Sequence, residues 1–169
     1  MTDRADLEAQ IRRPLRAESA VVARCPLGLP VVAAVPPILD DGTPFPTRFW
    51  LSCPLASIRI GRLEASGGVR AMERRAETDS DFAAELGAAH RRYAEDRDAI
   101  LPLGAAPVPS GGVGGARTGI KCLHAHYADH AAGNDNPVGR MVAPWVEPLN
   151  CTIPCVVAGA ANPAWREPR

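Results

Sequence analysis

The stretch "SAVVARCPLGLPVVAAV", residues 19–35, decides the fold class of this 169-residue chain. Two short runs rich in β-branched valine, at 19–25 and 30–35, flank the turn-like "PLGL", and this pattern predicts an antiparallel hairpin. A third run, "TRFWLSC" at 47–53, places Phe49 and Leu51 on one face and Trp50 on the other. We therefore expect one small sheet built from the first third of the chain.

Most of the remaining sequence has the apolar spacing of helices. Helices are expected at about 3–13, 54–65, 69–76, 80–100, 118–132 and 138–146. Because strands come first and helices follow, the sequence predicts an α+β fold, with a small antiparallel sheet in the N-terminal third covered by four or five helices. We expect an N-terminal helix within 1–18, a single domain over 19–157, and a flexible C-terminal tail at 158–169.

Composition argues against several classes of function. The formal net charge is zero and aromatic residues make up only 5%, so a nucleic-acid partner is not expected. No run of apolar residues is long enough to cross a membrane, and the charged N-terminus lacks the apolar stretch of a signal peptide. The expected location is therefore the cytoplasm, where cysteines are reduced thiols or metal ligands rather than disulfides.

The five cysteines stand in contexts that suggest chemistry. Cys25 and Cys53 are each followed by proline, and Cys53 stands at the expected start of a helix, where the dipole favours a thiolate. Cys122 and His126 have helical i, i+4 spacing, with His130 four residues further on. Alternatively, the helix begins later, and Cys122 and His124 turn toward one site from an irregular segment.

These residues predict a metal site. The candidate ligands are Cys25, Cys53 and Cys122 with His124 or His126 nearby, and soft thiolates favour zinc or an iron–sulfur cluster. Whether Cys151 and Cys155, in "CTIPC", join this site stays open. The competing interpretation is that the cysteines are small buried hydrophobic residues.

A glycine-rich loop, "LPLGAAPVPSGGVGGA" at 101–116, precedes the Cys/His segment. The following "SGGVGGARTGIK" lacks the spacing of a phosphate-binding P-loop, and no hydrophobic strand precedes it. A mobile hinge or lid is therefore the favoured interpretation. Arg117 and Lys121, at i, i+4 spacing, remain candidates for holding an anion.

Several segments together resemble a known bacterial family. They are "ARCPLGLPVV", "DDGTPFPTRFWLSCP", "GRLEASGGVRAM", "GIKCLHAHYADHAAGNDNPVG" and "CTIPC". Over about residues 20–157 the chain resembles the family called domain of unknown function 501, which is widespread in actinobacteria. The family has no established activity. Its genes tend to lie near those for an exopolyphosphatase and a septum-formation initiator. This is an association and not a mechanism, and it suggests the hypothesis of a protein partner in phosphate metabolism or cell division.

Two further hypotheses stand beside metal binding. A regulatory binding module would present an exposed apolar patch, for which the candidates are Phe45, Phe49, Trp50 and Trp145. A thiol-dependent enzyme would use Cys53 or Cys122 as nucleophile and His124 or His126 as base, with Arg117 and Lys121 holding an anionic substrate. The sequence names no third group that would orient the base.

Overall fold

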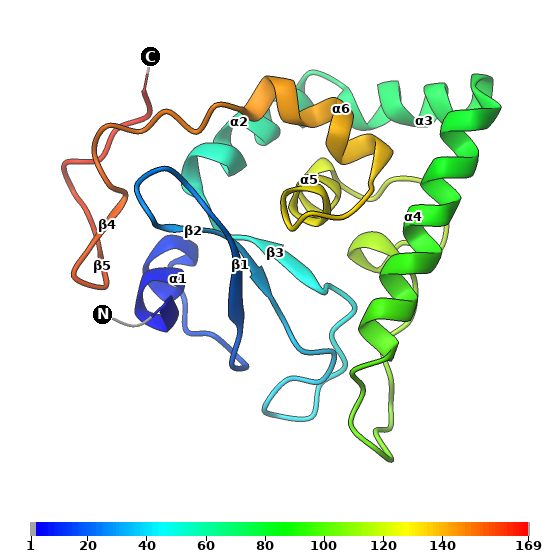
Figure 1. Cartoon of the computed structure of the whole chain (residues 1–169), viewed down its shortest axis with the longest axis horizontal. Helices are drawn as coiled ribbons and strands as arrows, with labels where there is room; N and C mark the ends of the chain where they lie inside the picture. The colour runs from blue at the N-terminus through cyan, green and yellow to red at the C-terminus, as the bar shows by residue number, and fades with distance from the viewer. Residues whose placement is uncertain (1–2, 169) are drawn as a thin grey trace.

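The computed structural model describes residues 3–168, and within them it has six α-helices and a small antiparallel sheet (Figure 1). The α-helices are α1 (Asp3–Ile11), α2 (Pro54–Ala65), α3 (Gly68–Thr78), α4 (Ser80–Asp98), α5 (Leu123–Ala131) and α6 (Pro137–Val146). The strands are β1 (Ala20–Arg24), β2 (Pro30–Ala34), β3 (Phe49–Leu51), β4 (Val156–Val157) and β5 (Ala160–Ala161), and η1 (Val113–Gly115) is a 3-10 turn. The α+β prediction is confirmed.

The sheet has the order β1-β2-β3, with both pairs antiparallel. β2 lies in the middle and is buried along its whole length. In β3, Phe49 and Leu51 pack against the main core, whereas Trp50 packs on the opposite face with Phe45. The alternation read from the sequence is therefore confirmed, because successive side chains of a strand point to opposite faces.

Helices α2 to α6 build the main core on one face of this sheet. α5 packs against β3, α2 and α6, and occupies the centre of Figure 1. The longest helix, α4, buries the expected stripe of Phe82, Leu86, Ala89 and Tyr93. The Asp79 side chain accepts a hydrogen bond from the Phe82 amide at 3.0 Å and thereby caps this helix.

The helix α5 begins at Leu123, five residues later than expected. Gly119 has a φ of +70°, in the left-handed region, and Cys122 is extended, so neither continues a right-handed helix. The Glu64 carboxylate then accepts a hydrogen bond from the Leu123 amide at 2.6 Å and satisfies one of the free N–H groups of the first turn. The single stripe of Cys122, His126 and His130 is therefore wrong, and the alternative of a later helix start is confirmed.

A buried polar network joins α4, α5 and α6. Asp129 is fully buried and accepts two hydrogen bonds from Arg92, at 3.1 and 2.5 Å. Asn136 donates to Asp129 at 2.9 Å, and its Oδ1 accepts from the Gly139 amide at the start of α6. The segment "HAHYADHAAGNDNPVG" thus supplies a polar junction between helices.

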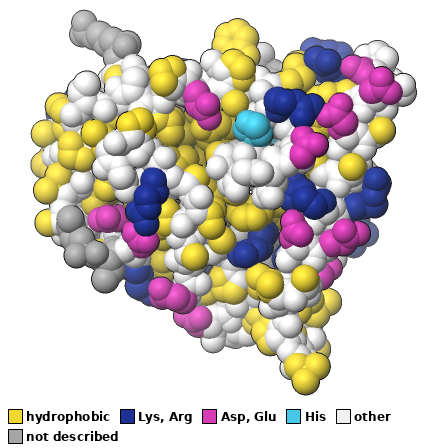
Figure 2. Space-filling model, in the orientation of Figure 1, with side chains coloured by type: hydrophobic (Ala, Val, Ile, Leu, Met, Phe, Trp, Pro, Cys, Tyr) yellow, Lys and Arg dark blue, Asp and Glu magenta, His cyan; other side chains and the backbone are white. Residues whose placement is uncertain are grey.

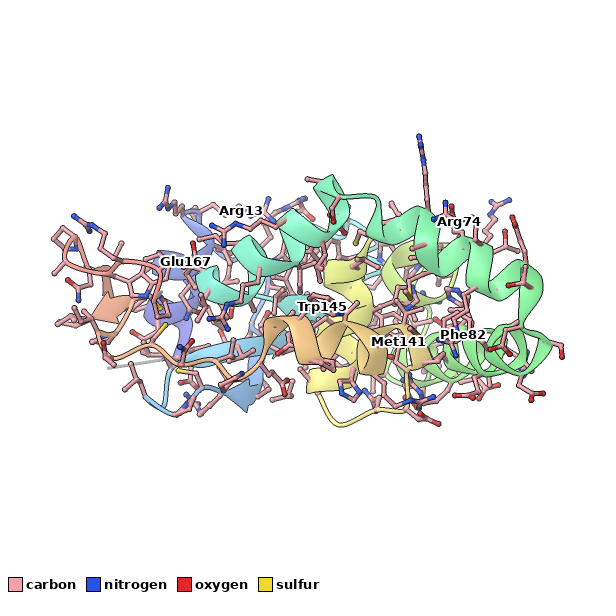
Figure 3. All side chains as sticks on the ribbon, turned by 90° about the horizontal axis from the view of Figure 1, so that it is seen from above. Arg13, Arg74, Phe82, Met141, Trp145 and Glu167 are labelled. Carbon is pink, nitrogen blue, oxygen red and sulfur yellow. The ribbon has the colours of Figure 1, made fainter. Side chains whose placement is uncertain are left out.

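The C-terminal segment packs beside the sheet. The β4–β5 hairpin contacts α1, and Trp165 packs against the main core. Glu167 lies beside α2 (Figure 3), where its two carboxylate oxygens accept hydrogen bonds from Arg62 at 2.5 and 2.7 Å. These contacts hold the segment up to Glu167 against the helices and strands that precede it.

Charged side chains of both signs alternate over α3 and α4, on the right of the face shown in Figure 2. None of the helices in residues 3–168 combines the length and the apolar character that crossing a bilayer requires.

Candidate functional site

Glu64, Cys122 and His124 meet at one point of the fold. Glu64 lies in the last turn of α2, Cys122 is the N-cap residue of α5, and His124 is in the first turn of α5. One oxygen of Glu64, the sulfur of Cys122 and one ring nitrogen of His124 all lie within 4.8 Å of one another. Among residues 3–168 this is the one group of three or more such side chains that is so closely spaced.

One hydrogen bond and one ion-pair contact fix the orientation of the His124 ring. Its Nδ1 lies 3.2 Å from Glu64 Oε1, and its Nε2 lies 3.2 Å from the Ser57 carbonyl oxygen. Glu64 Oε1 is itself held by the Leu123 amide. Both ring nitrogens therefore face oxygen acceptors, an arrangement that suits a proton or a metal ion on Nδ1 with Nε2–H donating to the carbonyl.

The electrostatic surroundings of Cys122 keep its thiol protonated in the absence of a cation. Burial raises the pKa of the Cys122 thiol, and the negative charge of Glu64 raises it further. The backbone amides of Ala125 and His124 and the charge of Lys121 act in the opposite direction. A free thiolate at this position is therefore disfavoured at neutral pH.

A pocket of about 310 Å³ opens beside the cluster. Its lining residues are Thr47, Phe49, Trp50, Leu51, Gly114, Lys121, Cys122, His124 and Ala125. The walls are mainly apolar, and the polar side chains that line it are Thr47, the Cys122 thiol, the His124 imidazole and the only lysine of the chain. This combination is typical of a small-molecule site.

Sequence reasoning named Cys122 and His124 but missed Glu64. Glu64 stands 58 positions before Cys122, inside an ordinary amphipathic helix, and no local pattern distinguishes it from the other acidic residues. Only the packing of α2 against α5 brings its carboxylate to the site.

The structure places Cys25 and Cys53 elsewhere. They line a second, small cavity together with Cys151 and Cys155, and Cys122 is not among its lining residues. The expectation that the start of α2 favours a Cys53 thiolate is wrong. Burial raises the pKa of this thiol to about 11, although the backbone amides of Ala56 and Leu55 oppose the shift.

His126 points away from both cavities and into the helix junction. It is fully buried, and its Nδ1 lies 3.1 Å from Asn136 Oδ1. Burial lowers the pKa of His126 to about 4, so the ring is neutral at physiological pH. Its neighbour across the junction is His90, with ring centroids 5.7 Å apart.

The glycine loop packs into the fold rather than forming a free lid. Val113 is fully buried, and its amide donates to His90 Nδ1 at 3.1 Å. The amides of Gly112 and Gly115 donate to carbonyl oxygens within the loop. Because these N–H groups are engaged, they do not form a phosphate cradle. Arg117 is exposed and does not line the pocket that contains Lys121.

The four aromatic candidates for a docking patch do not form one surface. Phe45 and Trp50 stack with their ring centroids 5.6 Å apart and line an apolar cavity of about 210 Å³ next to α1. Phe49 packs edge-on against Tyr93. Trp145 is 70% exposed on α6, near Met141 (Figure 3).

Comparisons with known proteins identify a family. The sequence profile of a family described as "Protein of unknown function (DUF501)" matches residues 21–144, which is more than half of the chain. A search of curated proteins and a search of solved structures gave no match.

Proposed function

The chain belongs to the DUF501 family of proteins of unknown function, and from its own residues we propose that it is a zinc-binding protein whose ion is held by Glu64, Cys122 and His124. The ion's remaining coordination position would face the pocket that Lys121 lines. The observation that carries the proposal is the meeting of these three donor atoms within 4.8 Å at the mouth of that pocket.

The donor set favours zinc over an iron–sulfur cluster, magnesium or calcium. Sulfur, imidazole nitrogen and carboxylate oxygen are the three ligand types that zinc accepts in proteins, at bond lengths of about 2.0–2.3 Å. An iron–sulfur cluster requires several thiolates, whereas this group has one. Magnesium and calcium prefer oxygen ligands throughout.

The two polar contacts of the His124 ring support the same proposal. A histidine that binds a metal through one ring nitrogen usually donates its other N–H to a carbonyl or carboxylate oxygen. Here Nε2 faces the Ser57 carbonyl oxygen, while Nδ1 faces Glu64. Zinc at Nδ1 would replace a proton between the imidazole and the carboxylate.

A thiol-dependent enzyme is supported less well, although Glu64 supplies the orienting group that the sequence lacked. A general base must have a free ring nitrogen to accept the proton of the thiol. Both nitrogens of His124 instead face oxygen acceptors. The raised pKa of Cys122 also disfavours a resting thiolate.

The pocket indicates the class of ligand that would reach the ion. Three protein ligands and one open position are the arrangement of catalytic zinc sites, in which the ion polarises an oxygen ligand. Lys121 adds a positive charge to otherwise apolar walls. A small molecule with an apolar body and a carboxylate or phosphate group fits this chemistry.

The test is zinc titration of the full chain after removal of metal under reducing conditions. Cys122→Ser and His124→Ala should each weaken binding at this site by more than about tenfold, because each removes a direct ligand. Glu64→Gln keeps an oxygen acceptor for the Leu123 amide but removes the charge, so it separates ligation from helix capping.

His130→Ala is the matched control, because His130 lies on the same helix outside the cluster. It should bind zinc as the wild-type chain does. Far-UV circular dichroism of the metal-free variants checks that each is folded. Unchanged zinc stoichiometry and affinity in both Cys122→Ser and His124→Ala would contradict the proposal.

A further inference from the structure

Four of the five cysteines converge on a cavity that the site above does not use. Cys25 follows β1, Cys53 precedes α2, and Cys151 and Cys155 belong to the C-terminal segment, yet all four line the same space. The segments that carry them are up to 130 positions apart in the sequence. Structural metal sites are typically built in this way, from thiols that lie on distant segments of the chain and meet in the fold.

The small size of this cavity suits a single ion better than a cluster. Its volume is about 10 Å³, which is the space of one water molecule or one small cation. An iron–sulfur cluster contains several iron and sulfide atoms and needs more room. A zinc ion bound by four thiolates needs no space beyond its own, because the sulfurs form its shell.

The thiols are close enough to influence one another electrostatically. Burial is the main cause that raises the pKa values of Cys53 and Cys155. A negative charge on Cys25 would raise both further, and Cys151 has the same effect on Cys155.

Hydrogen-bond donors surround the sulfurs. Gln10 Nε2 donates to Cys155 Sγ, and Trp165 Nε1 donates to Cys151 Sγ, each at 3.5 Å. Gln10 lines the cavity and is about nine-tenths buried, and its Oε1 has no hydrogen-bond partner among the described residues. Donors of this kind stabilise thiolates that bind a metal.

We propose that Cys25, Cys53, Cys151 and Cys155 bind one zinc ion as a closed tetrathiolate site. Each thiol releases its proton to solvent and donates a sulfur lone pair to Zn²⁺, and nothing is oxidised or reduced. The ion fastens the C-terminal segment to the hairpin and to α2. This site is independent of the Glu64, Cys122 and His124 site.

Binding requires the four sulfurs to move closer together. The four sulfurs of a zinc tetrathiolate lie roughly 3.8 Å apart, as bond lengths of about 2.3 Å demand. Within residues 3–168, no three of these cysteine sulfurs lie within 4.8 Å of one another. Cys25, Cys151 and Cys155 are partly exposed, so their side chains have the freedom to rotate inward.

The experiment uses the full chain, reduced and freed of metal, and titrates it with Co²⁺ as a spectroscopic probe. The wild-type chain should bind one equivalent with the intense sulfur-to-cobalt absorption of four thiolates. Cys151→Ser and Cys155→Ser should each lose that equivalent. Cys151 is only partly buried where it packs against the main core, and Cys155 is not part of that core, so the variants should fold, and circular dichroism checks this.

Two matched variants make the result specific. Cys151→His should still bind the metal with an altered spectrum, because three cysteines and one histidine also form a zinc site. Cys122→Ser should keep the tetrathiolate absorption, whether or not the Glu64, Cys122 and His124 site binds an ion. Cobalt or zinc binding that is unchanged in Cys151→Ser, or four cysteines recovered as two disulfides without metal, would overturn the proposal.

Discussion

At the scale of single residues, the histidines show how position determines role. His124 and His126 are two positions apart, but the first turns of α5 carry them to different places. His124 reaches the pocket and Glu64, whereas His126 is enclosed in the helix junction. Residue type alone made them equivalent candidates, and only the direction of each side chain separates them.

The buried carboxylate of Asp129 gives a prediction at this scale. Arg92→Ala should destabilise the protein by about 3 kcal/mol, because it removes the cation from a fully buried charge. The measurement is urea unfolding followed by circular dichroism. Asn134 and Asn136 would remain as the donors to Asp129.

Arg140→Ala is the control for that prediction. Arg140 pairs with Glu85 and Asp135 near the same junction, but its side chain is about half exposed. Exposed ion pairs contribute about 1 kcal/mol or less. Equal losses of stability in the two variants would contradict the role assigned to the buried Asp129.

At the scale of elements, the contact between α5 and α6 depends on a glycine. A Cβ added at Gly139 would lie 2.4 Å from both the His126 carbonyl oxygen and the His130 Cβ. Real Cβ atoms do not approach so closely, and the first of these neighbours is backbone. The helices can pack at this distance only because residue 139 has no side chain.

Gly139→Ala should therefore destabilise the fold by about 3 kcal/mol or more, since α6 must move away from α5. Thermal and urea unfolding measure the change. The matched substitution is Gly61→Ala in α2, where an added Cβ meets nothing within 4 Å and φ is not positive. That variant should be stabilised by about 0.5–1 kcal/mol, because alanine is the better helix former. An unchanged free energy of unfolding in Gly139→Ala would show that α5 and α6 do not need this close contact.

At the scale of the whole molecule, the two proposed zinc sites have different tasks. The Glu64, Cys122 and His124 site lies where α2, α5 and a pocket meet, inside the part matched by the family profile. The tetrathiolate site joins Cys25 and Cys53, within that part, to Cys151 and Cys155 beyond it. As proposed, the first would keep an open position for a ligand, and the second would be closed and structural.

Hydrogen exchange tests whether the proposed tetrathiolate site holds the C-terminal segment in place. Removal of metal from the wild-type chain should speed amide exchange in residues 149–165, because the segment loses its fastening to Cys25 and Cys53. The buried strand β2 should exchange slowly in both states. Cys151→Ser should exchange quickly with or without zinc, whereas Cys122→Ser should behave as the wild type. Identical exchange in the metal-loaded and metal-free wild type would contradict this task.

The sequence by itself determined the fold class and most elements. The hairpin, the two faces of β3 and the apolar stripe of α4 depend on local alternation and on period, so they could be read before any tertiary contact was known. The family was also recognisable from short segments in order, and the profile match confirms it.

Only the tertiary structure decided which reactive side chains meet. In the fold, four of the cysteines line one cavity and Cys122 lies apart from them. Glu64 lies beside Cys122 and His124, and His126 is buried in the junction between α5 and α6. The structure also reverses the expectation of a lowered pKa for the Cys53 thiol, because burial raises this pKa more than the backbone amides at the start of α2 lower it. These outcomes depend on contacts between residues far apart in the chain, and such contacts leave no periodic pattern in the sequence. The start of α5 is set in the same way, because its first amide finds its acceptor in Glu64 of another helix.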